Sequence, residues 1–131
     1  MEAFFDTSAL VPLLIKESGS SRACAYWSRT GAAWAWEWAR VETEAALTRR
    51  RVGPDAWAQW RRLAGHISFL KLEAPVSAIC DINRLLRLRA ADAGHVFVAE
   101  RLFRCQPELT FVTFDAEMQV AAGRLGLRVG E

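Results

Sequence analysis

The sequence predicts an α/β fold: a three-layer α/β/α sandwich with a central parallel sheet. Short apolar runs alternate with segments of helical periodicity, which is the pattern of a parallel sheet covered by helices on both faces. Hydrophobic residues make up 52% of the 131 residues, enough to form a core. No repeat, low-complexity tract or charge run indicates a linker. Residues 1–131 are therefore expected to form a single domain.

The strands are predicted from apolar runs. The first run, EAFFD, ends in a carboxylate at Asp6. The second, AAWAW, alternates large and small side chains, which places Trp34, Trp36 and Trp38 on one side and the alanines on the other. The predicted strands are residues 2–6, 32–36, 67–72, 109–114 and 127–129.

The helices are predicted from apolar spacing and from the positions of proline and glycine. Pro54 and Pro75 suit the first position of a helix, whereas Pro12 is tolerable only in a first turn. A break near Ala90 and Ala91 separates two helices in the second half of the chain. The predicted helices are residues 9–17, 20–30 and 39–50, one that begins at Pro54, and residues 75–89, 92–104 and 115–126.

Composition excludes several classes of protein. The formal net charge of +2 is too small to indicate nucleic-acid binding by itself. The amino terminus lacks a basic segment, and no run approaches the roughly 18 apolar residues of a membrane span, so a cytoplasmic protein without membrane contact is expected. Cys24, Cys80 and Cys105 form no CxxC pair and no zinc spacing. They are expected to be buried free thiols.

Four acids are expected to meet at one edge of the sheet. Asp6 ends the first strand, and Asp115 directly follows the strand that contains FVTF. Glu42 lies in the first turns of the helix after the tryptophan-rich strand, and Asp92 opens the helix before the FVTF strand. In open parallel sheets, ligands bind outside the carboxyl ends of the strands. The four carboxylates are therefore predicted to share a pocket there.

Such a cluster predicts a metal ion. Carboxylates a few ångströms apart raise one another's pKa unless a cation neutralises them. Hard oxygen ligands suit Mg²⁺ or Mn²⁺, and no cysteine–histidine set suggests zinc. A divalent ion held by acids can activate water and stabilise the charge on a phosphodiester.

Each acid also has a structural interpretation, which the sequence leaves open. Asp115 and Asp92 can act as helix N-caps, and Glu42 can be a surface acid. Asp6 is the hardest to explain structurally, because it ends a buried strand. His95, one turn after Asp92, is expected to be a core imidazole or a neighbour of the ligands rather than a ligand.

Three hydroxyl groups flank the acids. Thr7 and Ser8 follow Asp6, and Thr113 precedes Asp115 by two residues. They can orient a carboxylate, bind a metal-bound water or satisfy a backbone amide. N-capping of the first helix by Thr7 or Ser8 is an equally open alternative.

Four segments of the chain, in order, resemble the PIN-domain ribonucleases. FFDTSALVPLLIKE resembles their opening strand and helix, and ARVETEAALTRR their glutamate-bearing helix. LRAADAGHVFVAERL resembles their Asp-Ala-x-His helix, and FVTFDAEMQVAAGRLGL their closing Thr-x-Asp segment. The length is similar to that of the VapC-like toxins of bacterial toxin–antitoxin pairs. The resemblance covers essentially the whole chain.

The resemblance implies a metal-dependent endoribonuclease. Asp6, Glu42, Asp92 and Asp115 match the family's acidic positions, and Thr113 matches its hydroxyl position. Glu42 is preferred to Glu44 because it lies four residues before the Ala-Leu pair of ETEAAL.

The chain departs from the family pattern in one place. The strand before the glutamate often carries a serine, and Trp36 stands at that position here. This departure leaves the shape of the groove near Glu42 open.

The resemblance also implies partners. Such toxins are usually inhibited by a small antitoxin whose tail crosses the acidic groove, and they often form homodimers. Trp57 and Trp60 are candidates for this contact, with burial against the sheet as the alternative. Clusters of arginines would suit the phosphates of RNA, although each cluster also fits a solvated helix face. They are Arg49, Arg50, Arg51, Arg61, Arg62, Arg84, Arg87 and Arg89.

The resulting hypothesis is metal-assisted hydrolysis of RNA phosphodiester bonds, with no side chain as nucleophile. One alternative is a catalytically silent PIN-fold binding module, and another is an RNA-processing nuclease without an antitoxin. A receiver-like phosphoryl-transfer domain is disfavoured, because Asp6 lacks a second nearby acid and no lysine follows the FVTF strand.

Overall fold

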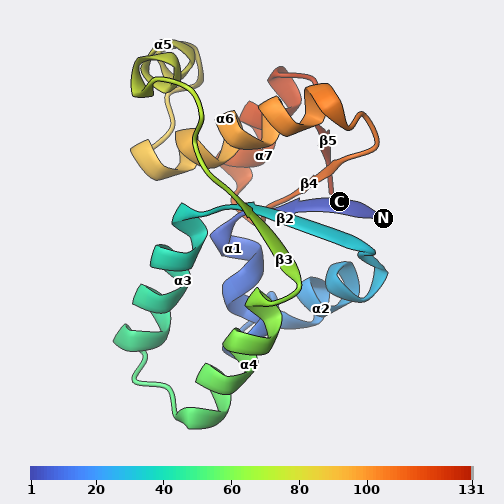
Figure 1. The fold of residues 1–131 in the computed structure, drawn as a ribbon, viewed down its shortest axis with the longest axis vertical. Coiled ribbons are helices and arrows are strands. Elements are labelled where there is room, and N and C mark those ends of the chain that lie inside the picture. Colours follow the sequence, from blue (N-terminus) through green and yellow to red (C-terminus); the bar gives the residue numbers. More distant parts are fainter. Residues whose placement is uncertain (131) are drawn as a thin grey trace.

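The computed structural model describes residues 1–130, which fold around one five-stranded sheet (Figure 1). All neighbouring strands are parallel, in the order β3-β2-β1-β4-β5. The strands are β1 (Glu2–Phe5), β2 (Ala32–Trp36), β3 (Ile67–Leu70), β4 (Thr110–Val112) and β5 (Arg128–Val129).

Helices cover both faces of the sheet, so the predicted three-layer α/β/α sandwich is confirmed. One layer holds α1 (Thr7–Leu10), the 3₁₀ helix η1 (Val11–Leu13), α2 (Ser20–Arg29), α3 (Trp38–Arg49) and α4 (Pro54–Ala64). The other holds α5 (Val76–Leu86), α6 (Ala90–Cys105) and α7 (Ala116–Arg124). In Figure 1 the two groups lie on opposite sides of the strands.

The core is divided by the sheet. Ala3 and Phe5 of β1 pack with the α1–α4 layer, whereas Phe4 packs with the α6–α7 layer and stacks on Phe111 of β4. Because both faces of β1 are buried, its sequence is a continuous apolar run rather than an alternating one. Burial on both sides also fixes the register, and the register positions the strand ends.

The carboxyl ends of the strands form one edge of the molecule. Phe5 is paired with Val112, so the next residues along, Asp6 and Thr113, are neighbours at this edge. The amide of Asp6 continues the pairing by donating to the carbonyl of Val112 at 3.2 Å. The entry to α3 lies at the same edge, where the Glu37 amide donates to the carbonyl of Leu70 at 2.8 Å.

The first helix differs from the prediction. It begins at Thr7 rather than at residue 9, and the helical segment ends with η1 at Leu13 rather than at residue 17. Pro12 lies in the first positions of the 3₁₀ turn, because it has no amide hydrogen to continue the α-helical bonding. Pro12 therefore divides the segment into two short helices.

The boundary between α5 and α6 was also predicted wrongly. The break lies at residues 87–89, and α6 begins at Ala90. Arg87 ends α5 in the left-handed conformation, with φ of 57°. The Asn83 side chain then closes the turn, since its amide group donates to the Leu88 carbonyl and its oxygen accepts from the Leu88 amide, both at 2.8 Å.

Two smaller predictions also need correction. Trp38 begins α3, so it does not continue the alternation of the AAWAW strand. The three cysteines are free but exposed rather than buried.

Within residues 1–130, no helix has the length and apolarity that a membrane span needs. Single-domain organisation of residues 1–131 stays a prediction, and Glu131 lies outside the described residues.

Candidate active site

The four predicted acids are carried by four different elements at the carboxyl edge of the sheet. Asp6 directly follows β1 and is 3% exposed, and Asp115 directly precedes α7. Glu42 lies on α3, and Asp92 lies in the first turn of α6. Asp92 is affected electrostatically by Asp115 and Glu42, and Asp6 is connected to the residues before Asp115 through the hydroxyls of Ser8 and Thr113.

Ser8 and Thr113 connect Asp6 to the start of α7. The Ser8 hydroxyl donates to Oδ1 of Asp6 at 2.8 Å and lies 3.2 Å from the Thr113 hydroxyl. It also accepts from the Phe114 amide at 2.9 Å, and the Thr113 hydroxyl accepts from the Asp115 amide at 3.2 Å. The two hydroxyls therefore fix the Asp6 carboxylate relative to the backbone that precedes α7.

Thr7 and His95 hold Glu42. The Thr7 hydroxyl donates to Oε1 of Glu42 at 2.8 Å, and Nε2 of His95 lies 2.5 Å from the same oxygen. His95 is 1% exposed and belongs to α6, the helix that carries Asp92. No local sequence pattern indicates the pairing of His95 with Glu42, because 53 positions separate them.

The structure decides between capping and the alternatives for several residues. Asp115 does cap α7, since its carboxylate accepts from the Met118 amide at 3.0 Å. Asp92 lies inside the first turn of α6 rather than at its N-cap. Thr7 and Ser8 lie within α1, so neither is its N-cap. Capping therefore explains one of the four acids only.

The environment of Asp6 and Asp92 disfavours their charged forms. Burial raises the pKa of Asp6 to about 6, against the opposing effects of the His95 charge and of hydrogen bonds from Ser8 and Thr113. The pKa of Asp92 is also raised, first by burial and then by repulsion from Asp115 and Glu42. His95 and Arg89 partly oppose the shift at Asp92.

Glu42 has the opposite tendency. Burial by itself raises its pKa, but the hydrogen bond from His95, the His95 charge and the Thr7 hydrogen bond together outweigh burial, so the pKa lies below its ordinary value. Glu42 is therefore ionised at neutral pH. The negative charge of Glu42 repels the charged form of Asp92 and so helps to raise the pKa of Asp92.

These observations test whether the residues suit a divalent cation. Among residues 1–130, no group of three or more Asp, Glu, His or Cys side chains stands arranged to hold a metal ion. The chemistry of the donors is nevertheless suitable, because the cluster offers carboxylate and hydroxyl oxygens and the repulsion at Asp92 is what a cation relieves. The His95 Nε2 atom is already occupied by Glu42. The residues present thus fit Mg²⁺ or Mn²⁺ better than zinc.

Trp36, at the position of the departure from the family pattern, borders this site. Its ring meets the His95 ring edge-on, with centroids 5.2 Å apart and planes at 85°. It also lines an apolar groove of about 480 Å³, together with Trp38, Val76 of α5 and Ala91 of α6. Trp36 therefore contacts His95, the partner of Glu42, and also forms part of the wall of this groove.

The tryptophan candidates for a partner contact differ in burial. Trp60 is 2% exposed and donates from its indole nitrogen to Oε2 of Glu44 at 3.1 Å, so it is a core residue. Trp57 is only partly buried. Because Glu44 binds Trp60, it is directed away from the acids, which supports the choice of Glu42.

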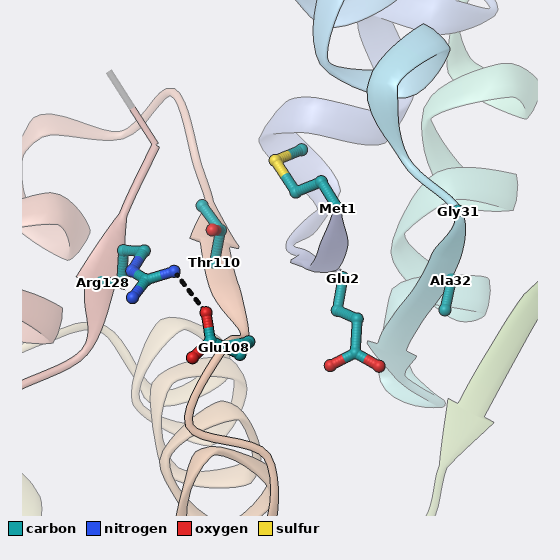
Figure 2. A pocket seen from close by; sticks show the side chains of 7 residues that line it. All are labelled: Met1, Glu2, Gly31, Ala32, Glu108, Thr110 and Arg128. Carbon is teal, nitrogen blue, oxygen red and sulfur yellow. Dashed lines mark hydrogen bonds and ion pairs between the residues drawn. The ribbon is translucent and has the colours of Figure 1, made fainter.

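A second hollow, of about 790 Å³, lies at the opposite edge of the sheet (Figure 2). Its lining includes Glu2 of β1, Thr110 of β4 and Arg128 of β5, each at the amino end of its strand. Arg128 pairs there with Glu108 at 3.3 Å. The predicted site residues are not among its lining residues.

Comparisons with known proteins agree with this architecture. No family model matches the chain. Two curated relatives from Mycobacterium tuberculosis are each 32% identical over 135 aligned positions, covering 96% of this chain and 92% of the relative. They are ribonuclease VapC45 of strain CDC 1551 / Oshkosh and ribonuclease VapC49 of strain ATCC 25618 / H37Rv.

Three solved structures share the fold, each with a TM-score of 0.68. PAE2754 from Pyrobaculum aerophilum is 20% identical, with 98% of this chain and 83% of that chain covered. VapC20 from Mycobacterium tuberculosis, a sarcin-ricin loop cleaving toxin, is 19% identical, with 92% and 95% covered. FitAcB from Neisseria gonorrhoeae is 20% identical, with 98% and 96% covered.

Proposed function

Because this chain belongs to the VapC-like PIN-domain ribonucleases, we propose that it is a divalent-metal-dependent endoribonuclease that acts as the toxin of a toxin–antitoxin pair. One observation carries the proposal beyond family membership. At the carboxyl edge of the sheet, Asp115 and Glu42 lie close enough to Asp92 to raise its pKa, and Asp6 is linked to the start of α7 through Ser8 and Thr113.

The cofactor in this proposal is Mg²⁺ or Mn²⁺, held by Asp6, Glu42, Asp92 and Asp115. When bound, such an ion activates water for attack on phosphorus and neutralises charge on the phosphate. The cluster offers the oxygen donors that these ions prefer.

The chain's own hydroxyl and imidazole groups position the carboxylates. Ser8 donates to Asp6, whereas Thr7 and His95 donate to Glu42. Each of these hydrogen bonds restricts the rotation of a carboxylate, so the acids are oriented before a ligand arrives. Thr113 supports Ser8 and the amide of Asp115. In this proposal Thr7, Ser8 and Thr113 are supporting residues.

The substrate class in this proposal is RNA. The arginines named from the sequence are all exposed, and guanidinium groups bind phosphate in a bidentate manner. Arg89 at the start of α6 lies near enough to the acids to lower the pKa of Asp92 against the larger effects that raise it. A phosphate backbone that reaches the acids would pass this arginine.

The partners in this proposal are a small antitoxin and a second copy of the chain. Family membership supports both, and so do exposed apolar side chains at the groove beside the site, Trp38 at 45% and Val76 at 67% exposure. Co-expression with the product of a short adjacent reading frame, followed by co-purification, tests the antitoxin. Light scattering of the purified chain tests the homodimer. A cytoplasmic location stays a prediction.

The decisive experiment is cleavage of single-stranded and structured RNA as Mg²⁺ or Mn²⁺ is titrated. Asp6→Asn is expected to lower the cleavage rate by about a hundredfold or more, a loss typical of removing one charge-stabilising group. The matched control is Asp55→Asn, which changes an exposed acid in the first turn of α4. Equal activity of Asp6→Asn and wild type would exclude the mechanism, and wild type without cleavage would favour a binding module.

A further inference from the structure

The ring of Trp36 occupies space that any side chain at position 94 would fill. Gly94 lies on α6, and a Cβ atom built there would lie 2.5 Å from Cη2 and 3.1 Å from Cε3 of Trp36. Real Cβ atoms essentially never make contacts under 3.0 Å. The indole of β2 and the bare backbone of α6 are therefore complementary, and Trp36 requires glycine at this position.

The same indole ring packs against the ring of His95. His95 follows Gly94 directly, and its ring meets Trp36 edge-on at 5.2 Å. Nε2 of His95 contacts Glu42 at 2.5 Å, while Nδ1 is buried and has no hydrogen-bond partner among residues 1–130. Within the described part of the chain, no second hydrogen bond therefore orients the ring, and packing against Trp36 restricts its rotation.

Glu42 depends on this contact for its orientation. Its side chain is 30% exposed, so burial alone does not fix its rotamer. His95 and Thr7 both donate to Oε1, which leaves Oε2 without a hydrogen bond from residues 1–130. The arrangement anchors one carboxylate oxygen and leaves the other free to accept a further contact.

We propose that His95 is the positioning residue for Glu42, and that Trp36 and Gly94 form a matched pair that holds the His95 ring in place. The activity part of this inference rests on the proposed function, because Glu42 matters to cleavage only if the acids hold the ion. The packing part does not. Trp36 departs from the family pattern, and in this proposal it supports the acid cluster and does not disrupt it.

The first test distinguishes the effect of the His95 hydrogen-bond donor from the effect of the volume of its side chain. His95→Gln keeps an N–H group that can reach Glu42, whereas His95→Leu keeps the volume and removes the donor. We expect His95→Leu to lower kcat by about 10- to 100-fold with little change in KM, the loss typical of groups that orient metal ligands. His95→Gln should recover most of this loss. Equal activity of the two variants, or a wild-type kcat in His95→Leu, would overturn the assignment.

The second test is a double-mutant cycle on the pair. Gly94→Ala should lower kcat in wild type, because the new methyl group displaces the indole and with it His95. In a Trp36→Ala background the same Gly94→Ala change should have no further effect, since the clash is gone. Additive losses would contradict the pairing. Gly123→Ala is the matched control, because Gly123 is also helical and a Cβ there meets nothing within 4 Å.

A spectroscopic readout keeps the inference testable without RNA. The chain has only two histidines, and His66 is exposed, so His66→Gln assigns the imidazole N–H signals by subtraction. The His95 Nε2 proton should resonate downfield, as expected for a proton bonded to a carboxylate. Gly94→Ala should shift or broaden this signal, whereas Gly123→Ala and Asp55→Asn should not.

The two proposals fail in distinguishable ways. If Asp6→Asn cleaves RNA as fast as wild type, the proposed function fails while the His95 signal still tests the packing. If Gly94→Ala leaves the His95 signal unchanged, with a wild-type urea midpoint confirming that it folds, the positioning inference fails on its own. If Gly94→Ala does not fold, recovery of the fold in the Trp36→Ala double variant supports the pair, and no recovery contradicts it.

Discussion

Among single residues, Asp6 shows most clearly that the site is not built for stability. It occupies the N-cap position of α1, yet its carboxylate makes no capping bond and is held by Ser8 instead. Burial raises its pKa to about 6, so at neutral pH the folded chain keeps a charge that its surroundings disfavour. A buried asparagine would avoid this cost. In the proposed function, the carboxylate is retained because it helps to hold the metal ion.

Asp6 gives a prediction for stability against pH. The folded pKa of about 6 lies above the ordinary value of 3.8, so between these values the folded state binds the proton more tightly than the unfolded state does. This contribution to stability is lost as pH rises through 6. Without divalent metal, Asp6→Asn should therefore unfold at higher urea than wild type at pH 7.5. The gain is up to about 3 kcal/mol, from 1.36 kcal/mol per pKa unit.

The difference between the two urea midpoints should shrink towards pH 4, where the wild-type carboxyl is protonated in the folded state. Asp55→Asn serves as the control for loss of a carboxylate at an exposed position. A midpoint for Asp6→Asn at or below wild type at pH 7.5 would show that the charge of Asp6 is not disfavoured in the fold.

The site residues that the sequence reveals are placed by local patterns, whereas those that it does not reveal are defined by contacts between residues far apart in the chain. Asp6 and Asp115 are recognisable because a strand end places them, and this requires only local pattern. The pairing of His95 with Glu42 spans 53 positions, and nothing local indicates it. The fit of Trp36 against Gly94 depends on how β2 and α6 pack. A glycine inside an otherwise helical pattern was the available signal.

Among the elements, α7 shows how one residue can serve both structure and site. Asp115 caps the helix by accepting from the Met118 amide, and it also raises the pKa of Asp92 through its charge. The strand-then-acid pattern of FVTFD is consistent with either role. Only a substitution that keeps one role and removes the other separates them.

Asp115→Ser and Asp115→Ala make this separation. Serine can still cap a helix, so Asp115→Ser should retain nearly wild-type stability, whereas Asp115→Ala should lose about 1 kcal/mol of unfolding free energy. Both should lose RNA cleavage, because both remove the carboxylate. Urea denaturation and cleavage rates on the same preparations provide the check. An active Asp115→Ser variant would reduce Asp115 to a helix cap.

Element boundaries were less predictable than element types. The five strands and the alternation with helices follow from apolar runs and periodicity. The first helix was misplaced because Pro12 lies in a 3₁₀ turn rather than in a first α turn. The break between α5 and α6 was misplaced because Arg87 adopts a left-handed conformation and Asn83 closes the turn, and neither residue type signals this strongly.

At the scale of the whole molecule, the parallel sheet itself creates the site. Every strand runs in the same direction, so the segments that leave the carboxyl ends, carrying Asp6 and Asp115, emerge at one edge. Helices α3 and α6 come from opposite layers, and they bring Glu42 and Asp92 to that edge. The fold could be predicted because this arrangement follows from topology. That the four carboxylates lie near one another was an expectation from this topology, and the sequence alone could not establish it.

Charge distribution gives a prediction at this scale. If RNA passes Arg89 on its way to the acids, KM for RNA should rise with salt, because arginine–phosphate contacts release counterions. Arg89→Gln should raise KM at low salt and lower the salt slope by about one unit. Arg61→Gln, at an exposed position on α4, is the control. Identical salt slopes for Arg89→Gln and wild type would place the RNA path elsewhere.

Binding of Mn²⁺ to the purified chain, measured by electron paramagnetic resonance or calorimetry, tests the acid cluster most directly. We expect saturable binding by wild type and by Asp55→Asn, and affinity lower by at least about tenfold for Asp6→Asn, as ligand-shell changes commonly produce. Equal Mn²⁺ affinity in all three proteins would show that the carboxylates at this edge of the sheet do not hold the ion.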